Sequence, residues 1–495
     1  MEIALACHRR IAADKPGLRV GLPEVTLGLL PGAGGTQRLP RLIGVRAALP
    51  YLLQGRTVAA ADALKAGMLH EVVPEAEVVE RAIAWVAAQA EPVTQPWDRK
   101  GYVLPDGPLD PVAIYQVFAQ ETARITARTQ NNQPAPRHIL SSVFEGCVTD
   151  IDTGLKSELR HFVACVCSVE SKNIIRTSFF GVTDMAKLKR RPAGVAELAI
   201  ESLGAVGSLE EVRPLVAAAV AAQLPVRWQD TAGEGTIPVD WQGRVEPVRD
   251  ATGLDGCQVV VVAGGAAAPE TGATLVIRLW PQGGCPLQGG VGLRIVPDVR
   301  LAEVIRDAET PPSAVAHAMD LARRLGKVPL VVKAQRGTYV ERVTGAYQRE
   351  VERLRAQGVP PVFIDNAARQ AGMQAAPCNA AVGDEPPRRT TPADWAAAAE
   401  AVARLKEQLL LVQAEEALRC LDEGVIDAPI DADVGALLGW GFPVHLGGPI
   451  GYVDTIGIDR FLERYEATAP ARELDAGVRK QLRAQAGLGR SFHGD

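Results

Sequence analysis

The chain has few aromatic residues, no long apolar run and no excess of positive charge. Phe, Trp and Tyr make up 5% of its 495 residues, and 53 Lys and Arg stand against 58 Asp and Glu, giving a formal charge of −5. The longest apolar run, residues 215–222, is far shorter than the roughly 18 residues that span a membrane. Membrane-spanning proteins and nucleic-acid-binding proteins are therefore disfavoured.

The chain also lacks a C-x-x-C pair among its eight cysteines, and its first residues, MEIALACHRR, lack the features of a signal peptide. Both absences predict reduced thiols in a cytoplasmic protein. Cys165 and Cys167 lie two positions apart on a predicted helix, which favours core packing over metal binding. We predict no metal site, because the histidines have no ligand spacing either: His8, His70, His317 and His445.

The apolar pattern predicts a mixed α/β chain, and the length predicts three or four domains. A segment at 3–13 is expected to enter a buried strand, and 139–180 to form one or two long helices with an apolar stripe that includes Leu159 and Val163. A β-α-β unit is expected over 196–230. The other expected strands lie at 259–263 and 275–279, and the other expected helices at 59–66, 75–90, 301–308, 313–325, 339–357 and 394–421.

Two glutamates near the start could form an acid–base pair. Glu2 and Glu24 each lie in apolar surroundings, EIALAC and GLPEVTLG. A carboxyl group in a dry pocket has its charged form disfavoured, so it can act as a general acid near neutral pH. Two such groups sharing one water could add it across a polarised double bond. Solvated or helix-capping glutamates are the more common interpretation of such a pair.

The glycine-rich loop at 31–35 precedes a predicted helix that carries Arg38 and Arg41. These arginines could reach a CoA phosphate, although a solvated helix face is the more common explanation for such residues. By itself the loop predicts only a tight turn.

The amino-acid sequence around these residues resembles that of a known family. The segments MEIALACHRRIAAD, GLPEVTLGLLPGAGGTQRLPRLIGVRAA and GRTVAAADALKAGMLHEVV are similar to the second half of the enoyl-CoA hydratase (crotonase) fold, in the version found in multifunctional fatty-acid β-oxidation enzymes. The resemblance implies that Glu2 is the first catalytic glutamate and Glu24 the second, with a CoA thioester as substrate. It leaves open whether Δ3-enoyl isomerase activity accompanies hydration, because the same two glutamates could serve both reactions.

One departure from the family concerns the oxyanion hole. In the family, one backbone N–H donor comes from a glycine-rich turn just before the first glutamate, and the other from a strand further upstream. Here the sequence starts one residue before Glu2. Each such donor contributes about 3–4 kcal/mol to transition-state stabilisation. We expect that the start was assigned inside a longer gene; the alternative is a truncated remnant.

The rest of the chain resembles the other parts of the same multifunctional enzymes. SSVFEGCVTDIDTGLKSELRHF is similar to their helical connector, and LRIVPDVRLAEVIRDAETPPSAVAHAMDLARRLGKVPLVVK to the active-site segment of 3-hydroxyacyl-CoA dehydrogenase. LLVQAEEALRCLDEGVIDAPIDADVGALLGWGFPVHLGGPIGYVDTIG is similar to the last helical domain. The predicted α/β architecture is the C-terminal half of a crotonase domain, a linker with connector helices, a degenerate Rossmann-like NAD-binding-type domain and two mainly helical dehydrogenase C-terminal domains. In that order they cover 1–95, 96–190, 191–300, 301–390 and 391–495.

The dinucleotide-binding loop of the family is only partly present. Binding requires G-x-G-x-x-G, but the chain has SLGAVGSLEE, in which Gly204 and Gly207 remain and Glu210 and Glu211 follow. A pair of carboxylates at this place would repel phosphate. Asp230 lies where a ribose-binding acid is expected, although an aspartate in the turn after a strand is an equally good interpretation.

The catalytic positions of the dehydrogenase are also changed. Arg294 stands where the family has its catalytic histidine, and arginine cannot accept a proton. The acidic partner is retained as Glu303, unless it is a surface residue at the start of a helix; Glu341 replaces the family's asparagine. Tyr452 matches a tyrosine near the substrate, with half-buried packing as the alternative.

Together these observations predict a fatty-acid β-oxidation enzyme that hydrates 2-enoyl-CoA to 3-hydroxyacyl-CoA. The resemblance implies a cytoplasmic oligomer with a thiolase subunit as a possible partner. It also implies an NAD-dependent dehydrogenase activity, which we expect to be impaired. The alternative hypothesis is a catalytically inactive scaffold, or a fragment of such a complex.

Overall fold

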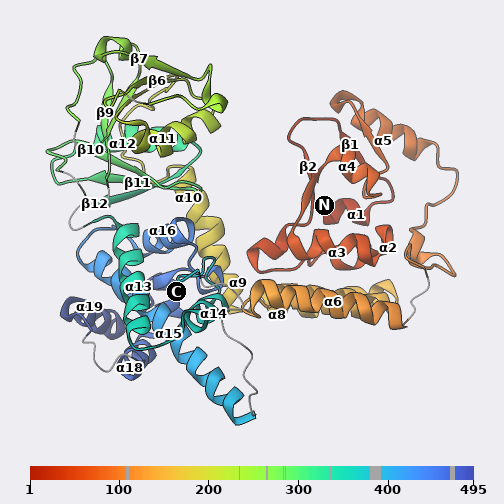
Figure 1. Ribbon diagram of the computed structural model, residues 1–495. Coiled ribbons are helices and arrows are strands. Elements are labelled where there is room, and N and C mark those ends of the chain that lie inside the picture. The colour runs from red at the N-terminus through yellow and green to blue at the C-terminus, as the bar shows by residue number, and fades with distance from the viewer. Residues whose placement is uncertain are drawn as a thin grey trace. The chain divides into compact units, whose positions relative to one another are not determined.

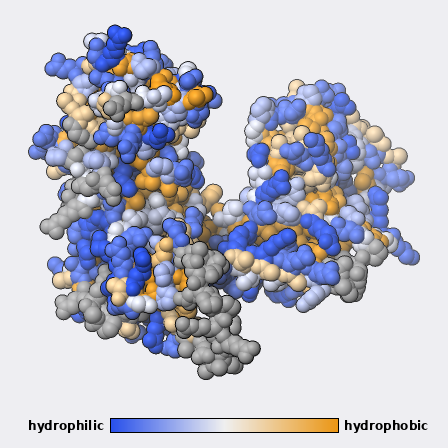
Figure 2. All heavy atoms as spheres, in the orientation of Figure 1, coloured by the Kyte–Doolittle hydropathy of each residue, from blue (hydrophilic) through white to orange (hydrophobic). Residues whose placement is uncertain are grey.

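The computed structural model divides the chain into two compact units, Met1–Ile175 and Arg176–Asp495 (Figure 1). Charged and polar side chains cover most of the surface seen in Figure 2. No helix within the described part of the chain is long and apolar enough to span a lipid bilayer. The boundary expected at residue 390 lies outside the described residues, which are 1–107, 111–233, 235–263, 266–281, 284, 286–333, 337–379, 392–468 and 474–494.

The first unit combines short strands with helices. Strand β1 (Ile11–Ala13) pairs in parallel with β4 (Glu71–Val73), and β2 (Arg19–Gly21) pairs antiparallel with β3 (Thr57–Ala59). Three short 3-10 turns are η1 (Glu24–Leu27), η2 (Glu75–Glu77) and η3 (Pro96–Asp98). The helices are α1 (Glu2–Ala6), α2 (Gly35–Ile43), α3 (Val45–Gln54), α4 (Ala60–Lys65), α5 (Val78–Ala87), α6 (Pro111–Thr129), α7 (Ala135–Cys147), α8 (Ile151–Val166) and α9 (Val169–Ile174).

Two expectations for this unit need correction. The segment 3–13 begins with helix α1, and only its last residues form a strand. On α8, only part of the predicted apolar stripe is buried: Phe162 packs against the core, whereas Leu159 and Val163 are 56% and 52% exposed. The most buried residues of α8 are Gly154, Glu158 and Cys165. The helix therefore turns a glutamate toward α7 and α2, against which it packs.

The second unit contains one eight-stranded sheet, in the order β12-β11-β10-β9-β8-β5-β6-β7. Neighbouring strands are parallel except β10 and β11. From β7 to β10 the order is the 3-2-1-4-5-6 order of a doubly wound dinucleotide-binding fold. The strands are β5 (Leu203–Val206), β6 (Val226–Gln229), β7 (Val245–Val248), β8 (Val259–Ala263), β9 (Leu275–Leu279), β10 (Val291–Ile295), β11 (Leu301–Arg306) and β12 (Val328–Lys333).

The expected β-α-β unit is present as β5, helix α11 (Leu209–Ala221) and β6. The helix expected at 301–308 is wrong, because these residues form the buried strand β11 between β10 and β12. The sheet therefore does not end at residue 300, as the expected domain boundary implies, but continues to Lys333. Helix α12 (Pro312–Arg324) connects its last two strands.

Helices make up most of the remainder of the second unit. The long helix α15 (Pro392–Asp422) packs against α13 (Tyr339–Ala356), α14 (Pro361–Ala371), α17 (Pro449–Ile456), α18 (Ile458–Thr468) and α19 (Ala476–Gly487). The shorter elements are the π-helical η4 (Ile175–Gly181), α10 (Val182–Ala186), α16 (Pro429–Trp440), and the 3-10 turns η5 (Val239–Trp241), η6 (Ala251–Leu254) and η7 (Val444–Leu446).

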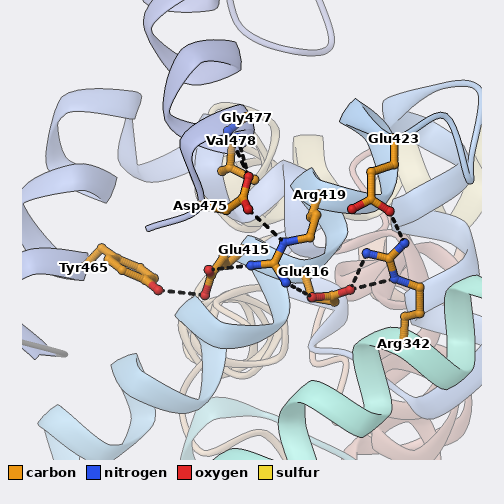
Figure 3. Close-up of polar contacts among 9 residues, drawn as sticks. All are labelled: Arg342, Glu415, Glu416, Arg419, Glu423, Tyr465, Asp475, Gly477 and Val478. Carbon is orange, nitrogen blue, oxygen red and sulfur yellow. Dashed lines mark hydrogen bonds and ion pairs between the residues drawn. The ribbon is translucent and has the colours of Figure 1, made fainter. Parts of the chain in front are cut away.

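A network of paired charges joins α13, α15 and α18 (Figure 3). Arg342 Nη2 lies 2.7 Å from Glu416 Oε1, and Arg419 bridges Glu416 and Glu415 at 2.9 and 3.0 Å. The Tyr465 hydroxyl donates to Glu415 at 2.7 Å. Each buried charge thus has a partner, as burial of an ion requires.

A histidine near the C-terminus is held between two carboxylates. His493 Nδ1 lies 2.6 Å from Asp454 Oδ2, and Nε2 lies 3.1 Å from Asp433 Oδ2. Burial alone would lower the pKa of His493, but the bonds to Asp433 and Asp454 outweigh it and the pKa is raised, against the opposing charge of Arg176. The protonated His493 ring therefore holds residues 492–494 against α16 and α17.

This arrangement makes stability depend on pH. The raised pKa of His493 adds stability that is complete below the unfolded value, about 6.5, and is lost as the pH rises through the folded value. We expect His493→Gln to lower the free energy of unfolding at pH 6 by about 3 kcal/mol, because it removes the cation that lies between two buried carboxylates. The difference from wild type should shrink toward pH 9 in urea titrations. The exposed His8→Gln should match wild type throughout, and a pH-independent loss in His493→Gln would contradict the assignment.

Candidate functional site

The structure places Glu2 against the glycine-rich loop. Glu2 lies in the first turn of α1, and its Oε1 accepts hydrogen bonds from the backbone N–H groups of Ala33 at 2.7 Å and Gly35 at 2.8 Å. Gly35 is the first residue of α2, so the carboxylate lies at a helix N-terminus, where negative charge is favoured. A Cβ at Gly35 would lie 2.9 Å from Glu2 Oε1, so only glycine leaves room for this contact.

Glu24 opens the 3-10 turn η1 and is the second member of the pair. Its Oε2 is buried and has no hydrogen-bond partner. Burial raises the pKa of Glu24, and the nearby charge of Glu2 raises it further. The two carboxyl groups are thus close enough to interact, and they differ in environment: Glu2 accepts hydrogen bonds from two backbone N–H groups, whereas burial of Glu24 favours its protonated form.

The two arginines after the loop have structural partners. Arg38 Nη1 donates to the carbonyl of Ala33 at 2.8 Å. Arg41 is 6% exposed and donates to the carbonyls of Gln37 and Gly146, which ties α2 to α7. Arg41 therefore lies neither on a solvated face nor free to bind a phosphate, contrary to both interpretations of the sequence.

Glu158 is a residue of this site that the sequence analysis missed. It lies on α8, is 1% exposed, and accepts from the N–H groups of Gly34 at 2.5 Å and Thr36 at 2.9 Å. Its Oε2 also accepts from the Thr36 hydroxyl. Burial raises the pKa of Glu158 to about 7, against these hydrogen bonds and with a contribution from the charge of Glu2. The available signal was its spacing with Gly154 and Cys165, which places it on one helix face with them.

The candidate dinucleotide site has a different arrangement from the one its family resemblance implies. Ser208 caps α11, and the Glu211 carboxylate accepts from the Ser208 N–H at 3.0 Å and hydroxyl at 2.7 Å. The Glu211 carboxylate therefore occupies the N-cap amide at the start of this helix and places negative charge where a pyrophosphate would bind. A Cβ at Gly207 would lie 2.5 Å from the Cβ of Ala263, at the end of β8.

The other two residues proposed for this site are also engaged locally. Gly204 lies within β5, where a Cβ would approach Val260 of β8 to 2.9 Å, so it serves close strand packing. Asp230 follows β6 and accepts from the N–H groups of Ala232 at 3.0 Å and Gly235 at 2.8 Å. This is the turn aspartate of the alternative interpretation. The residues present here do not fit NAD.

The candidate catalytic positions of the dehydrogenase form an ion cluster. Arg294 of β10 lies 3.0 Å from Glu303 Oε2 through Nη1 and 3.4 Å from Glu341 Oε1 through Nε. Glu303 is 1% exposed and also accepts from the N–H of Val340 at 3.0 Å. Burial raises the pKa of Glu303, and Arg294 opposes the shift. The idea that Glu303 is a surface residue at the start of a helix is wrong, since it lies inside β11.

Tyr452 lies on α17 in the helical core and is 4% exposed. Burial raises the pKa of its hydroxyl to about 12, with a contribution from the charge of Glu407, and Arg464 forms a hydrogen bond with it. This environment fits the packing interpretation more closely than a substrate contact. Within the described residues, no group of three or more His, Cys, Asp or Glu side chains could hold a metal ion.

Several known proteins are similar to parts or all of this chain. Residues 1–95 match the enoyl-CoA hydratase/isomerase family. The whole chain is similar to the fatty acid oxidation complex subunit alpha of Shewanella amazonensis, with 29% identity over 84% of that protein. The corresponding protein of Shewanella loihica is 29% identical over 94% of this chain and 80% of its own length. The solved 3-hydroxybutyryl-CoA dehydrogenase of Escherichia coli aligns with 59% of this chain and all of its own at 15% identity and a TM-score of 0.46.

The family match and the two alpha-subunit relatives confirm the resemblance found in the sequence. The chain has an enoyl-CoA hydratase/isomerase-type domain at its N-terminus, and its likeness to the alpha subunits extends through both units. The strand order of the second unit independently supports the predicted Rossmann-like architecture.

Proposed function

We propose that this relative of fatty acid oxidation complex alpha subunits hydrates 2-enoyl-CoA thioesters in fatty-acid β-oxidation. The observation that carries the proposal is the pair of interacting carboxyl groups in unlike environments, Glu2 bound by two backbone N–H groups and Glu24 buried with an unpartnered oxygen. Such a difference assigns one group as base and the other as acid.

In the proposed reaction, the Glu2 carboxylate accepts a proton from water while the water oxygen bonds to the β-carbon of the enoyl thioester. The protonated Glu24 donates its proton to the α-carbon, which receives the electron pair of the broken π bond. Transfer of a proton from Glu2 back to Glu24 through solvent restores both groups. Residues 33–36, called loop 33–36, join the glycine-rich loop to the first turn of α2. Their four backbone amides all donate to carboxylates, so the donors to the thioester oxygen must come from elsewhere.

The direct test is hydration of crotonyl-CoA by the purified chain, followed as the loss of the absorbance of the conjugated thioester. Hydration that is proportional to protein concentration supports the proposal. A folded chain that gives no hydration above the uncatalysed rate contradicts it. In that case, the second candidate function is a scaffold without hydratase chemistry. The ion cluster of Arg294, Glu303 and Glu341 favours this candidate, because charged residues that pair with one another occupy the place of the catalytic histidine.

We further propose that the second unit does not oxidise 3-hydroxyacyl-CoA. The Glu211 carboxylate at the N-terminus of α11 and the arginine at position 294 support this. We expect a fluorescence titration with NADH to show no saturable binding up to about 1 mM. A dissociation constant of that size corresponds to a binding free energy of about −4 kcal/mol. Saturable binding below that concentration, or reduction of NAD with 3-hydroxybutyryl-CoA, would overturn the proposal.

For partners and location, the relatives' names support assembly into a complex, and we propose a thiolase subunit as partner and an oligomeric state for this chain in the cytoplasm. The seven cysteines within the described residues are all free thiols, in keeping with a reducing compartment. Co-purification with a thiolase from the native host tests the partner.

A further inference from the structure

We propose that Glu158 is a positioning residue of the hydratase site: from helix α8, outside the matched residues 1–95, it holds loop 33–36 in the conformation that binds Glu2. The inference rests on the proposed function for its catalytic consequence. Its structural part concerns only hydrogen bonds within the first unit.

The amides of loop 33–36 alternate between two carboxylates. The first and third, of Ala33 and Gly35, donate to Glu2 at 2.7 and 2.8 Å. The second and fourth donate to Glu158 at 2.5 and 2.9 Å. Neighbouring amides of this turn therefore donate to different carboxylates. Glu2 by itself would satisfy only two of the four amides. Glu158 binds the other half, so the two glutamates fix the loop together.

The conformation of the loop depends on this arrangement. Gly34 has φ +99°, a value that side chains rarely adopt, and its N–H is one of the two that Glu158 binds. Without Glu158, the buried amides of Gly34 and Thr36 would lose their acceptor, which is unfavourable for a donor that water cannot reach. The loop would then relax, and the two donors that hold Glu2 would move with it.

Glu158 is itself firmly placed. The Thr36 hydroxyl, which contacts Glu158, lies 2.8 Å from Ser142 Oγ of α7, and Gln37 Nε2 donates to the Ser142 carbonyl at 2.9 Å. Three helices therefore meet at this carboxylate. Two carboxyl groups lie close together at this helix N-terminus, where four backbone donors and the helix dipole favour negative charge.

One consequence is that the hydratase site does not end at residue 95. Helix α8 begins at Ile151, yet it supplies the acceptor for two of the four loop amides. The connector thus contributes to the chemistry through Glu2, although it touches no reacting atom in this proposal.

The test compares Glu158→Gln and Glu158→Asp with Glu145→Gln in the full chain. Glu145 is a matched control, because its carboxylate binds Ser157 and His161 in the same pair of helices but makes no bond to the loop. Amide hydrogen exchange of the peptide covering residues 33–36 is the first readout. We expect exchange to rise about tenfold or more in Glu158→Gln and to stay at the wild-type rate in Glu145→Gln.

The second readout is crotonyl-CoA hydration. We expect Glu158→Gln to lower kcat by about 10–100-fold with little change in KM, because a small displacement of a catalytic group slows the chemical step. Glu158→Asp should recover part of the loss. Equal loss in both variants together with a matching rise in KM would indicate general disruption and overturn the assignment, as would wild-type kcat in Glu158→Gln.

The two proposals can fail separately. If wild type does not hydrate crotonyl-CoA, the proposed function fails, whereas amide exchange still decides whether Glu158 holds the loop. If Glu158→Gln does not fold, Thr36→Val removes one bond to Glu158 and keeps the backbone donor. Its loop exchange should then rise about threefold, and an unchanged rate would overturn the inference.

Discussion

Replacing Glu24 by glutamine should lower kcat/KM for hydration of crotonyl-CoA by about 10²–10⁴-fold, the usual contribution of a general acid or base. Glutamine keeps the size of the side chain but cannot donate a proton to the α-carbon. Folding should be unaffected, since Glu24 Oε2 has no protein partner to lose. Circular dichroism and the thermal midpoint of the variant should therefore match those of wild type.

The pH dependence of the rate gives a second signature of the same residue. Burial raises the pKa of Glu24, so its carboxyl group stays protonated above the ordinary range of a glutamate. Because the acid must carry its proton, kcat/KM should fall as the pH rises through this raised pKa. The profile should therefore lose its alkaline limb in Glu24→Gln, measured on whatever activity remains.

Two further variants make the assignment specific. Glu2→Gln should cost a similar factor, because glutamine can still accept from Ala33 and Gly35 but cannot take a proton from water. Glu71→Gln, which removes a surface ion pair with Arg9, should keep the wild-type rate. Wild-type activity in Glu24→Gln would show that the pair does not carry the reaction.

How far the sequence predicted this site depends on the kind of signal. Glu2 and Glu24 could be identified because they are unusual residues in apolar surroundings and match a long family pattern. Glu158 could not be found in this way. Apolar periodicity marked the face of α8 that carries Leu159 and Val163, whereas the buried face holds a glutamate whose partners lie more than 120 residues away in the chain. Hydrogen bonds between distant segments leave no local pattern.

The second unit shows the opposite error. Residues 301–308 contain good helix formers, and local propensity predicted a helix, which left a surface position for Glu303 as the alternative to a catalytic role. In the structure, pairing with β10 and β12 outweighs that propensity. The charge of Glu303 inside the strand is compensated by Arg294 and by a hydrogen bond from the Val340 N–H. The apolar runs predicted the parallel strands of the Rossmann-like region. They could not predict that β11 continues the sheet, because that depends on the pairing of Glu303 with Arg294.

This pairing leads to the largest stability effect that we expect. Replacing Arg294 by methionine should lower the free energy of unfolding by about 3–5 kcal/mol, because it leaves a buried carboxylate without its cation. Glu303 would retain Val340 N–H as a donor, which cannot compensate a full charge. Urea unfolding at pH 7, monitored by tryptophan fluorescence, measures the loss.

Two further variants distinguish the effect of losing the ion pair from the effect of losing the packing contacts of the Arg294 side chain. Arg294→Met combined with Glu303→Gln removes both charges and should recover most of the stability. Arg306, on β11 of the same sheet, pairs with Asp427 at the surface, and Arg306→Met should cost less than about 1 kcal/mol. The loss in Arg294→Met should also diminish as the pH falls, since the raised pKa of an unpaired Glu303 lets it protonate and the neutral acid is tolerated in the core. If Arg294→Met were as stable as wild type, Arg294 would not be the structural counter-ion of Glu303, and its presence at the catalytic position would need a chemical explanation instead.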